Sequence, residues 1–373
     1  MSRRARLREL AGSLRDTVLR MFPHRAPTGL LAVGRPGPDS PVLLTGNYTL
    51  TVRRVLRALR GVDAWLLVAD SRGINVWCAA GGGHLTHHDV ITAIRAARLD
   101  EKVRHRRIVL PQLAAPGVER RKVAEATGWK VVWGPVRAED LPAFLGRGLR
   151  ATREEREVRF SPADRLEMAA VWAGPMTAIA GPVAGLAGGW PVGLAAALLV
   201  PVLVGALFLA AGRLPVQGAS GAVVYAGAAL AGTVAGEGML ALAGAASPGG
   251  AVVLLLVLGA AMAVLSIDLA GTTPLMPSTV NRFRKGLDVE LLPDRCTGGG
   301  ECLLVCPRGV LRMDGRRRKA VRERPERCLW CGACIVQCPA DAVRFRTRDG
   351  RVLPPDEVRG TRLDLLGRRS IRI

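Results

Sequence analysis

The cysteines of this 373-residue chain are concentrated near its carboxyl end, where seven of the eight lie between positions 296 and 338. One run has the spacing C-x-x-C-x-x-C-x-x-x-C-P and comprises Cys328, Cys331, Cys334 and Cys338. A degenerate copy 32 residues earlier comprises Cys296, Gly299, Cys302 and Cys306, again followed by proline. Thiolates spaced in this way on a tight loop can bind separate irons of an iron–sulfur cubane, whereas C-x-x-C pairs also bind zinc.

The two Cys-Pro endings and the evenly spaced third cysteine favour iron–sulfur clusters over zinc and are typical of bacterial two-cluster ferredoxins, in which the fourth cysteine of each run binds the neighbouring cluster. Crossed ligation predicts one [4Fe–4S] cluster on Cys306, Cys328, Cys331 and Cys334. The other site takes Cys296, Cys302 and Cys338, and Gly299 leaves it one thiolate short. A [3Fe–4S] cluster, a [4Fe–4S] cluster with a non-cysteine ligand and an unstable site all remain open there. We expect an α+β ferredoxin domain over residues 287–348 and a basic tail over 349–373.

The eighth cysteine, Cys78, lies in a region where strand-type and helix-type segments alternate. Strands are predicted at 41–45, 64–70, 107–110 and 130–133, and helices at 52–59, 89–97, 118–127 and 138–145. This alternation predicts an α/β domain over residues 1–160, in which a parallel sheet is covered by helices and binds ligands beyond the carboxyl ends of its strands. Cys78 follows the second strand, where a binding loop is expected, although a lone cysteine is more often a structural thiol. Nearby His84, His87 and His88 are open to two interpretations, a metal site or an unpaired group at a helix start.

Residues 168–272 contain only three charged side chains, Arg213, Glu237 and Asp268. Four apolar stretches, at 168–190, 191–212, 218–246 and 249–271, each reach the roughly 20 residues that cross a bilayer. We therefore predict a four-helix transmembrane bundle. The first stretch contains Gly174, Pro175, Gly181 and Pro182 and is expected to be kinked or re-entrant. Glu237 and Asp268 either line a proton or ion path or are neutral, hydrogen-bonded or close to water.

The flanking charges predict the orientation of this bundle. Arg213, the arginine-rich run 150–165 and the basic residues of 282–285 would share one side, which places both soluble domains in the cytoplasm and the chain in the inner membrane as a multi-pass protein. Residues 1–30 lack the apolar run of a signal peptide. The 53 Lys+Arg against 31 Asp+Glu are not interleaved with aromatic residues, so we expect a bilayer partner and no nucleic acid. A simple soluble enzyme, a secreted disulfide scaffold and a disordered chain are excluded.

The segment Asn75-Val-Trp-Cys-Ala-Ala-Gly81 resembles the cap-helix motif of the membrane corrinoid protein of bacterial mercury methylation. That family is related to the corrinoid iron–sulfur protein of acetyl-CoA synthesis, and its partner is a two-cluster ferredoxin. Further similar segments follow in the family's order at 39–45, 47–48, 110–113, 115–117, 134–137 and 270–274. The resemblance implies an α/β Rossmann-like corrinoid-binding domain with Cys78 as the catalytic lower axial ligand of cobalt. It implies further cofactor-binding residues, namely Thr45, Asn47, Asn75, Val76, Trp77, Ala79, Ala80 and Gly81.

The function implied by this resemblance is corrinoid-dependent methyl transfer by a membrane-anchored methyltransferase whose fused ferredoxin reduces the cobalt. The implied partners are a methyl-donor protein or small one-carbon donor and a cellular low-potential reductant, with Hg(II) as a candidate acceptor. Three departures weaken the mercury assignment more than the corrinoid assignment: Gly82 replaces a lysine of the family motif, Gly299 replaces a cluster cysteine, and no cysteine pair follows Cys338. The alternative is a membrane-bound iron–sulfur electron-transfer protein without methyltransferase activity.

Overall fold

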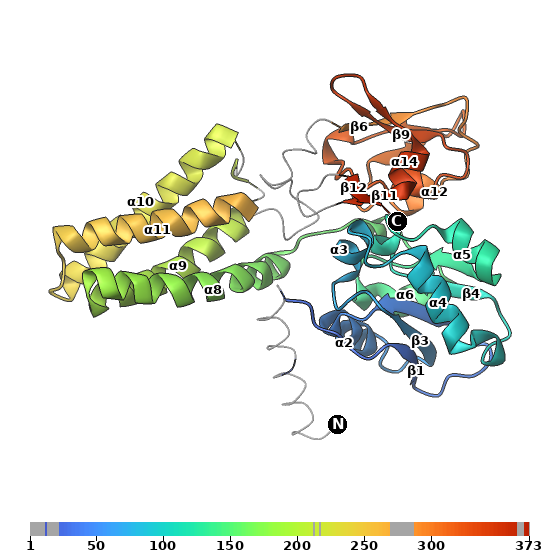
Figure 1. Cartoon of the computed structure of the whole chain (residues 1–373), viewed down its shortest axis with the longest axis horizontal. Helices are drawn as coiled ribbons and strands as arrows, with labels where there is room; N and C mark the ends of the chain where they lie inside the picture. The colour runs from blue at the N-terminus through green and yellow to red at the C-terminus, as the bar shows by residue number, and fades with distance from the viewer. Residues whose placement is uncertain are drawn as a thin grey trace. The chain divides into compact units, whose positions relative to one another are not determined.

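The computed structural model describes residue 12 and residues 22–211, 213–215, 218–268, 287–363 and 369–372. These residues form two compact units, one containing 22–158 with 287–372 and the other beginning at 159 and containing the apolar helices (Figure 1). The segment 270–274, the basic residues 282–285 and most of the first 21 residues, on which some sequence predictions depend, lie outside the described residues.

The first unit contains a five-stranded sheet of order β1-β3-β2-β4-β5. Its strands are β1 Gly29–Val33, β2 Val42–Gly46, β3 Ala64–Ala69, β4 Arg107–Leu110 and β5 Lys130–Trp133. The strands β2 to β5 pair in parallel, whereas β1 is an antiparallel edge strand that the sequence reading missed. All five residues of β2 are buried, as a central parallel strand with both faces covered requires. The predicted parallel sheet is therefore confirmed, with one added edge.

Helices pack on both faces of this sheet because successive strand residues point to opposite sides. Leu44 and Leu67 pack with residues of α4 His87–Ala97 and α5 Arg120–Thr127. Leu43 and Leu66 pack with residues of α2 Thr49–Ala58 and α6 Leu141–Gly146. Shorter elements connect them: α3 Val76–Gly81, α7 Arg153–Arg156, η1 Leu99–Glu101, η2 Gln112–Ala114 and η3 Ala138–Asp140. The predicted helix 138–145 is thus divided into η3 and α6.

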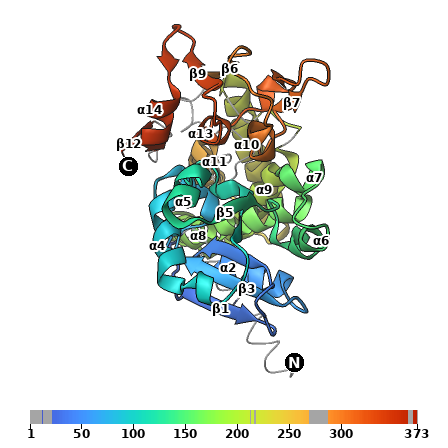
Figure 2. The same cartoon turned by 90° about the vertical axis from the view of Figure 1, so that its right-hand side faces the viewer.

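The ferredoxin-like part of the first unit is a small α+β fold (Figure 2). A three-stranded antiparallel sheet has the order β10-β9-β6, with β6 Leu287–Leu291, β9 Val343–Thr347 and β10 Val352–Leu353. A separate hairpin pairs β7 Leu311–Met313 with β8 Ala320–Arg322. The short helices are α12 Glu301–Leu304, η5 Pro325–Arg327 and α13 Ala333–Val336.

The segment after residue 348 is folded, which corrects the prediction of a basic tail. It forms α14 Pro355–Gly360 and a strand pair, β11 Thr361–Leu363 with β12 Arg369–Arg372. Val358 is fully buried and Arg362 is only 1% exposed. The Arg362 guanidinium donates to the carbonyl oxygens of Arg359 (2.8 Å) and Thr361 (2.9 Å). Hydrogen bonds to carbonyl groups let an arginine occupy the interior, so a high density of arginine did not mean a solvated tail.

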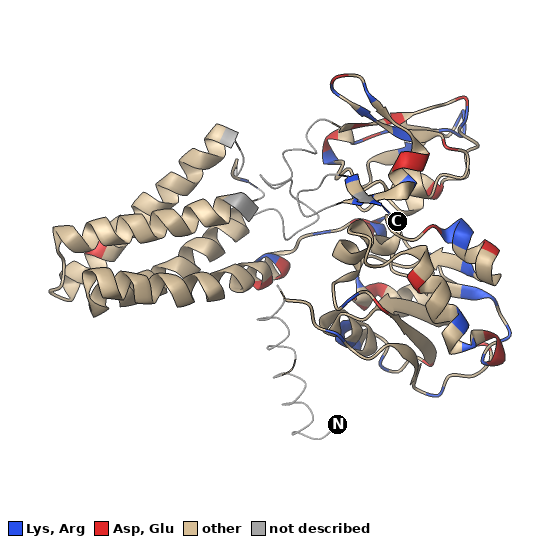
Figure 3. Cartoon of the chain, in the orientation of Figure 1, with Lys and Arg blue, Asp and Glu red and all other residues tan. Residues whose placement is uncertain are grey.

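The second unit consists of four long apolar helices, α8 Pro162–Gly188, α9 Trp190–Ala210, α10 Gly218–Leu242 and α11 Pro248–Asp268. By length and composition, all four could cross a membrane. Charged residues appear at the start of α8 and are scarce elsewhere in the bundle (Figure 3). Large apolar side chains point outward, including Ile179, Leu186, Val223 and Leu242, which are 67–93% exposed. An outer surface of this kind suits lipid better than water.

The first helix, α8, is continuous, which argues against the re-entrant alternative, whereas a kink stays a prediction. It runs through Pro175 and Pro182 without ending. A proline removes one backbone hydrogen bond, and a neighbouring helix can offset that loss by close packing. Gly193 of α9 allows such an approach, because a Cβ there would lie 2.8 Å from the Cα of Gly185.

Glu237 lies in α10, and its Oε1 atom is buried without a hydrogen-bond partner among the described residues. A hydrogen bond to that atom is therefore not observed, and a proton path stays a prediction. The side chain of Asp268 lies outside the described residues.

Candidate functional site

The helix α3 presents Cys78 at the carboxyl edge of the parallel sheet. Its residues Val76, Ala79 and Ala80 are buried, whereas Cys78 is exposed. This spacing follows helical periodicity, because residues three and four apart share a face and Cys78 lies on the other one. Asn75 caps the helix through its side-chain oxygen, which accepts from the backbone N–H of Cys78 at 3.0 Å. The cap and the buried face together fix the direction of the thiol, so Cys78 is not a structural core thiol.

Asn47 holds the loop that leads from β3 into α3. Its Oδ1 atom accepts from the backbone N–H groups of Ser71 and Gly73, both at 2.9 Å, and from the Ser71 hydroxyl at 3.1 Å. Its Nδ2 group donates to Asp70 at 2.9 Å. The side chain is 3% exposed, so the structure gives Asn47 a positioning role. Direct contact of Asn47 with a cofactor stays a prediction, as it does for Thr45, which is 1% exposed.

A glycine in the loop after β4 allows α3 to be approached closely. A Cβ at Gly117 would lie 2.4 Å from the carbonyl oxygen of Leu85 and 2.7 Å from that of Ala80. Real side chains do not reach such distances, so the loop 115–118 can touch the end of α3 only with glycine at this position. The local sequence therefore determines where the cap segment lies on the sheet edge.

His87 is buried at the start of α4, whereas His88 is exposed. Burial and the Lys122 ammonium lower the pKa of His87 to about 4, against the opposing effect of Glu119. The Nδ1 atom of His87 lies 3.7 Å from Glu119. Across the described residues, no three His, Cys, Asp or Glu side chains are placed to hold a single metal ion. The histidines therefore do not form the metal site considered from the sequence, and His87 is not a solvated group.

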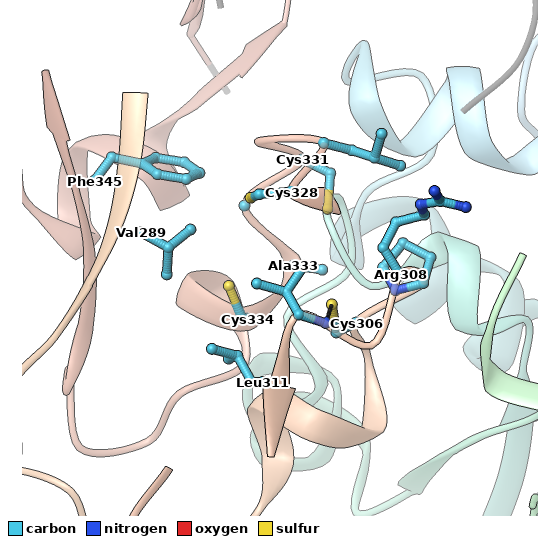
Figure 4. A pocket seen from close by; sticks show the side chains of 13 residues that line it. Val289, Cys306, Arg308, Leu311, Cys328, Cys331, Ala333, Cys334 and Phe345 are labelled. Atoms are coloured by element: carbon cyan, nitrogen blue, oxygen red, sulfur yellow. Dashed lines mark hydrogen bonds between the residues drawn. The ribbon is translucent and has the colours of Figure 1, made fainter. Parts of the chain in front are cut away.

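The first cysteine cavity is formed by four thiols, Cys306, Cys328, Cys331 and Cys334, with an apolar lining that includes Val289, Leu311 and Phe345 (Figure 4). Backbone N–H groups point at two of the sulfurs: Val310 donates to Cys306 at 3.3 Å and Trp330 to Cys328 at 3.4 Å. Hydrogen bonds of this kind stabilise metal-bound thiolates and tune cluster potentials.

The second cysteine cavity is lined by the remaining three thiols, Cys296, Cys302 and Cys338, together with the glycines 298–300. Ala320 donates to the sulfur of Cys296 at 3.5 Å, and Ala342 donates to that of Cys338 at 3.3 Å. The two cavities divide the seven cysteines as crossed ligation predicts. The bound clusters themselves stay a prediction.

Both cavities fit iron–sulfur clusters. Burial and neighbouring thiols raise the pKa of Cys302 to about 12, and burial also raises that of Cys328 to about 12. Such thiols would lose their protons on binding a metal. Among the described residues, no three His, Cys, Asp or Glu side chains are grouped as a single zinc ion requires. A cubane spreads its thiolates over separate irons and matches this arrangement.

The ferredoxin part contacts the α/β part through the same loop, 115–118, that touches α3. Gln337 is 4% exposed, and its Nε2 group donates to the carbonyl oxygens of Ala115 (2.8 Å) and Val118 (2.7 Å). Arg362 donates to that of Gly117 at 2.9 Å. Sequence reasoning missed Gln337 and Arg362, because each binds backbone atoms more than 200 positions away and no local pattern marks them.

Apolar and charged contacts extend this interface. Val305 and Ala333 belong to the same buried core as α4 and α5, and Cys331 packs against it. Arg120 pairs with Glu301, and Arg153 pairs with Glu323 at 2.6 Å. The first cysteine cavity therefore has one of its cysteines beside the α/β core.

Known proteins match both parts of this unit. Residues 19–145 match the family described as CO dehydrogenase/acetyl-CoA synthase delta subunit. Residues 295–342 match the 4Fe-4S dicluster domain, which supports the cluster interpretation of the two cavities.

Curated relatives match the amino-terminal part. The gamma subunits of the acetyl-CoA decarbonylase/synthase complex from Archaeoglobus fulgidus and Methanopyrus kandleri are 37% and 38% identical over 125 residues. The alignments cover 33% of this chain and 26% and 27% of those subunits. The subunit from Methanothermobacter thermautotrophicus is 33% identical over 127 residues, covering 34% of this chain and 27% of its own. The chain thus spans about a quarter of the length of these relatives.

Proposed function

We propose that this chain is a membrane-anchored corrinoid protein that takes part in methyl transfer and receives electrons from its own ferredoxin domain. The observation that carries the proposal is the loop 115–118. One side of it contacts the end of α3, which presents Cys78, and the other accepts hydrogen bonds from Gln337 and Arg362 of the ferredoxin part. The likeness of residues 19–145 to subunits of an acetyl-CoA-forming complex supports the same reading.

The residues around Cys78 fit a corrinoid. When bound, a corrinoid supplies a cobalt centre that carries a methyl group and must be kept reduced. Cys78 would bind the cobalt through its exposed sulfur, and Asn75 would keep the first turn of α3 in place. Asn47 would hold the loop 71–73, which precedes α3, through its hydrogen bonds to Ser71 and Gly73. Open binding surfaces of α/β sheets lie at this edge, which supports placing the cofactor there.

The cluster residues would relay electrons beside this site. Cys306, Cys328, Cys331 and Cys334 would hold a [4Fe–4S] cluster, and Cys296, Cys302 and Cys338 a second, incomplete one. The packing of Cys331 against the α/β core supports the complete cluster as the donor nearest the corrinoid domain. A low-potential reductant of the cell would supply the electrons.

The four apolar helices would anchor the protein in the cytoplasmic membrane. Their length, composition and outward apolar side chains support this placement. Four crossings return the chain to the side where it entered, so both soluble parts would share the cytoplasm. The arginine-rich run 150–165 before and within the start of α8 supports that side.

The acceptor of the methyl group would be a one-carbon acceptor, with Hg(II) as one candidate. The resemblance of the cap segment supports mercury, whereas Gly82 and the names of the curated relatives favour other acceptors. Incubation with a labelled methyl donor and Hg(II), followed by an assay for methylmercury, decides between them.

The main test is anaerobic purification of the full chain in detergent with cobalt and iron measured per chain. We expect both metals and an absorption spectrum typical of thiolate-bound cobalt. Cys78→Ala should lose that spectrum while keeping iron. Asn75→Ala weakens the helix cap but retains the sulfur, so it should weaken the spectrum of thiolate-bound cobalt without abolishing it. Iron without corrinoid would refute the proposal and leave a membrane-bound iron–sulfur electron-transfer protein.

A further inference from the structure

The two cysteine cavities come from one duplicated motif but differ at one equivalent position. Cys331 of the first cavity corresponds to Gly299 of the second, 32 residues earlier. Cys331 is partly buried and packs against the α/β core. Gly299 is exposed. This ligand position therefore faces protein in the first cavity, at Cys331, and faces solvent in the second cavity, at Gly299.

The backbone does not require glycine at position 299. The two neighbouring positions do require glycine, because Gly298 has φ 76° and Gly300 has φ 75°, conformations that side chains disfavour. A Cβ at Gly298 would also lie 2.3 Å from the Arg318 carbonyl oxygen. Gly299 has no positive φ, and a Cβ there would meet only the Thr297 hydroxyl, at 4.0 Å. The loop could carry a cysteine without strain, so only the ligand is missing and the shape of the site is kept.

The other three ligand positions of this cavity are complete. Cys302 and Cys338 are buried, and the sulfurs of Cys296 and Cys338 each accept a backbone N–H. Among the residues that line the cavity, Glu301 carries the only carboxylate. Its Oε1 atom pairs with Arg120, whereas its Oε2 atom is buried without a hydrogen-bond partner among the described residues. Three thiolates can hold a cubane, and the Arg120 guanidinium competes with an iron for the Glu301 carboxylate.

We propose that the second cavity holds a cubane through three thiolates only and leaves the iron at Gly299 to an exchangeable ligand from solvent, either hydroxide or a small thiol. The proposal rests on the iron–sulfur part of the proposed function and is independent of the corrinoid. It identifies a ligand-binding position beside the exposed residue Gly299, distinct from the position of Cys331, which packs against the α/β core.

One-electron oxidation provides the first test on the reduced full chain. An iron without a protein thiolate leaves a [4Fe–4S]²⁺ cluster as Fe²⁺ when ferricyanide accepts one electron. The remaining [3Fe–4S]⁺ core is detected by electron paramagnetic resonance and the ferricyanide becomes ferrocyanide. We expect about one Fe²⁺ released per chain, and recovery after addition of Fe²⁺ and dithionite. Gly299→Cys should abolish the release and the three-iron signal.

A thiol probe provides the second test. With 4-fluorothiophenol, the ¹⁹F resonance of wild-type protein should show one paramagnetically shifted bound species, which Gly299→Cys should lack. Glu301→Gln should bind the probe as wild type does. Appearance of the bound species only in Glu301→Gln would show that Glu301 is the fourth ligand and overturn the proposal. Two oxidation-resistant four-iron clusters in wild type would also overturn it. Protein without any iron would refute the cluster part of the proposed function itself.

Discussion

Exchange of Asn47 and Asp70 tests whether Asn47 positions the cap segment or touches the cofactor. Asn47 accepts three hydrogen bonds from the loop 71–73 and donates one to Asp70. Asn47→Ala removes all four. Asn47→Asp keeps an acceptor for the loop and loses the donor, which places two carboxylates where an amide and a carboxylate were 2.9 Å apart.

The size of the effect follows from the groups left without partners. Asn47→Ala leaves the buried N–H groups of Ser71 and Gly73 unpaired, at about 1–3 kcal/mol each, so we expect a loss of about 2–6 kcal/mol in unfolding free energy. Asn47→Asp should cost less, about 1–3 kcal/mol, because only the bond to Asp70 is replaced by repulsion. The double variant Asn47→Asp with Asp70→Asn restores one donor and one acceptor and should recover part of this loss.

Two measurements on detergent-solubilised protein give the answer. Chemical unfolding followed by tryptophan fluorescence gives stability, and titration with a corrinoid under reducing conditions gives affinity. A positioning residue predicts that stability and corrinoid affinity fall together in Asn47→Asp and recover together in the double variant. Corrinoid affinity that stays low in a double variant of restored stability would refute the positioning role and show that the Asn47 amide contacts the cofactor.

Three further predictions concern the same unit. The pKa of His87 is about 4 in the folded chain and 6.5 in the unfolded chain, so the unfolded state binds more protons between these values. The unfolding free energy should therefore fall by about 3 kcal/mol as the pH drops from 6.5 to 4. His87→Phe should flatten this dependence when unfolding is measured at a series of pH values. Gln337→Leu leaves the carbonyl groups of Ala115 and Val118 unpaired and should lower the unfolding free energy by about 2–4 kcal/mol; an unchanged unfolding midpoint would contradict the interface. Gly117→Ala should displace the end of α3 and reduce corrinoid binding without loss of iron, as metal analysis would show.

Much of the α/β part was predictable because its elements have local causes. The strands β4 and β5 have the predicted bounds, each a short apolar run after one basic residue. The outward position of Cys78 follows from the helical spacing of its neighbours. The edge strand β1 was missed because it pairs with β3, which lies 31 or more residues further along the chain. The folded segment after residue 348 was missed because the carbonyl partners of Arg362 are visible only in three dimensions.

The sequence by itself predicted which cysteines line the same cavity. Cysteine spacing is a local property, and a duplicated spacing implies crossed ligation wherever the two copies fold together. Only the tertiary structure decided what surrounds each copy. Cys331 and Gly299 occupy the same place in the motif, yet one packs against the α/β core and the other faces solvent. The burial of a side chain depends on which distant residues pack beside it, and the local cysteine spacing does not predict those residues.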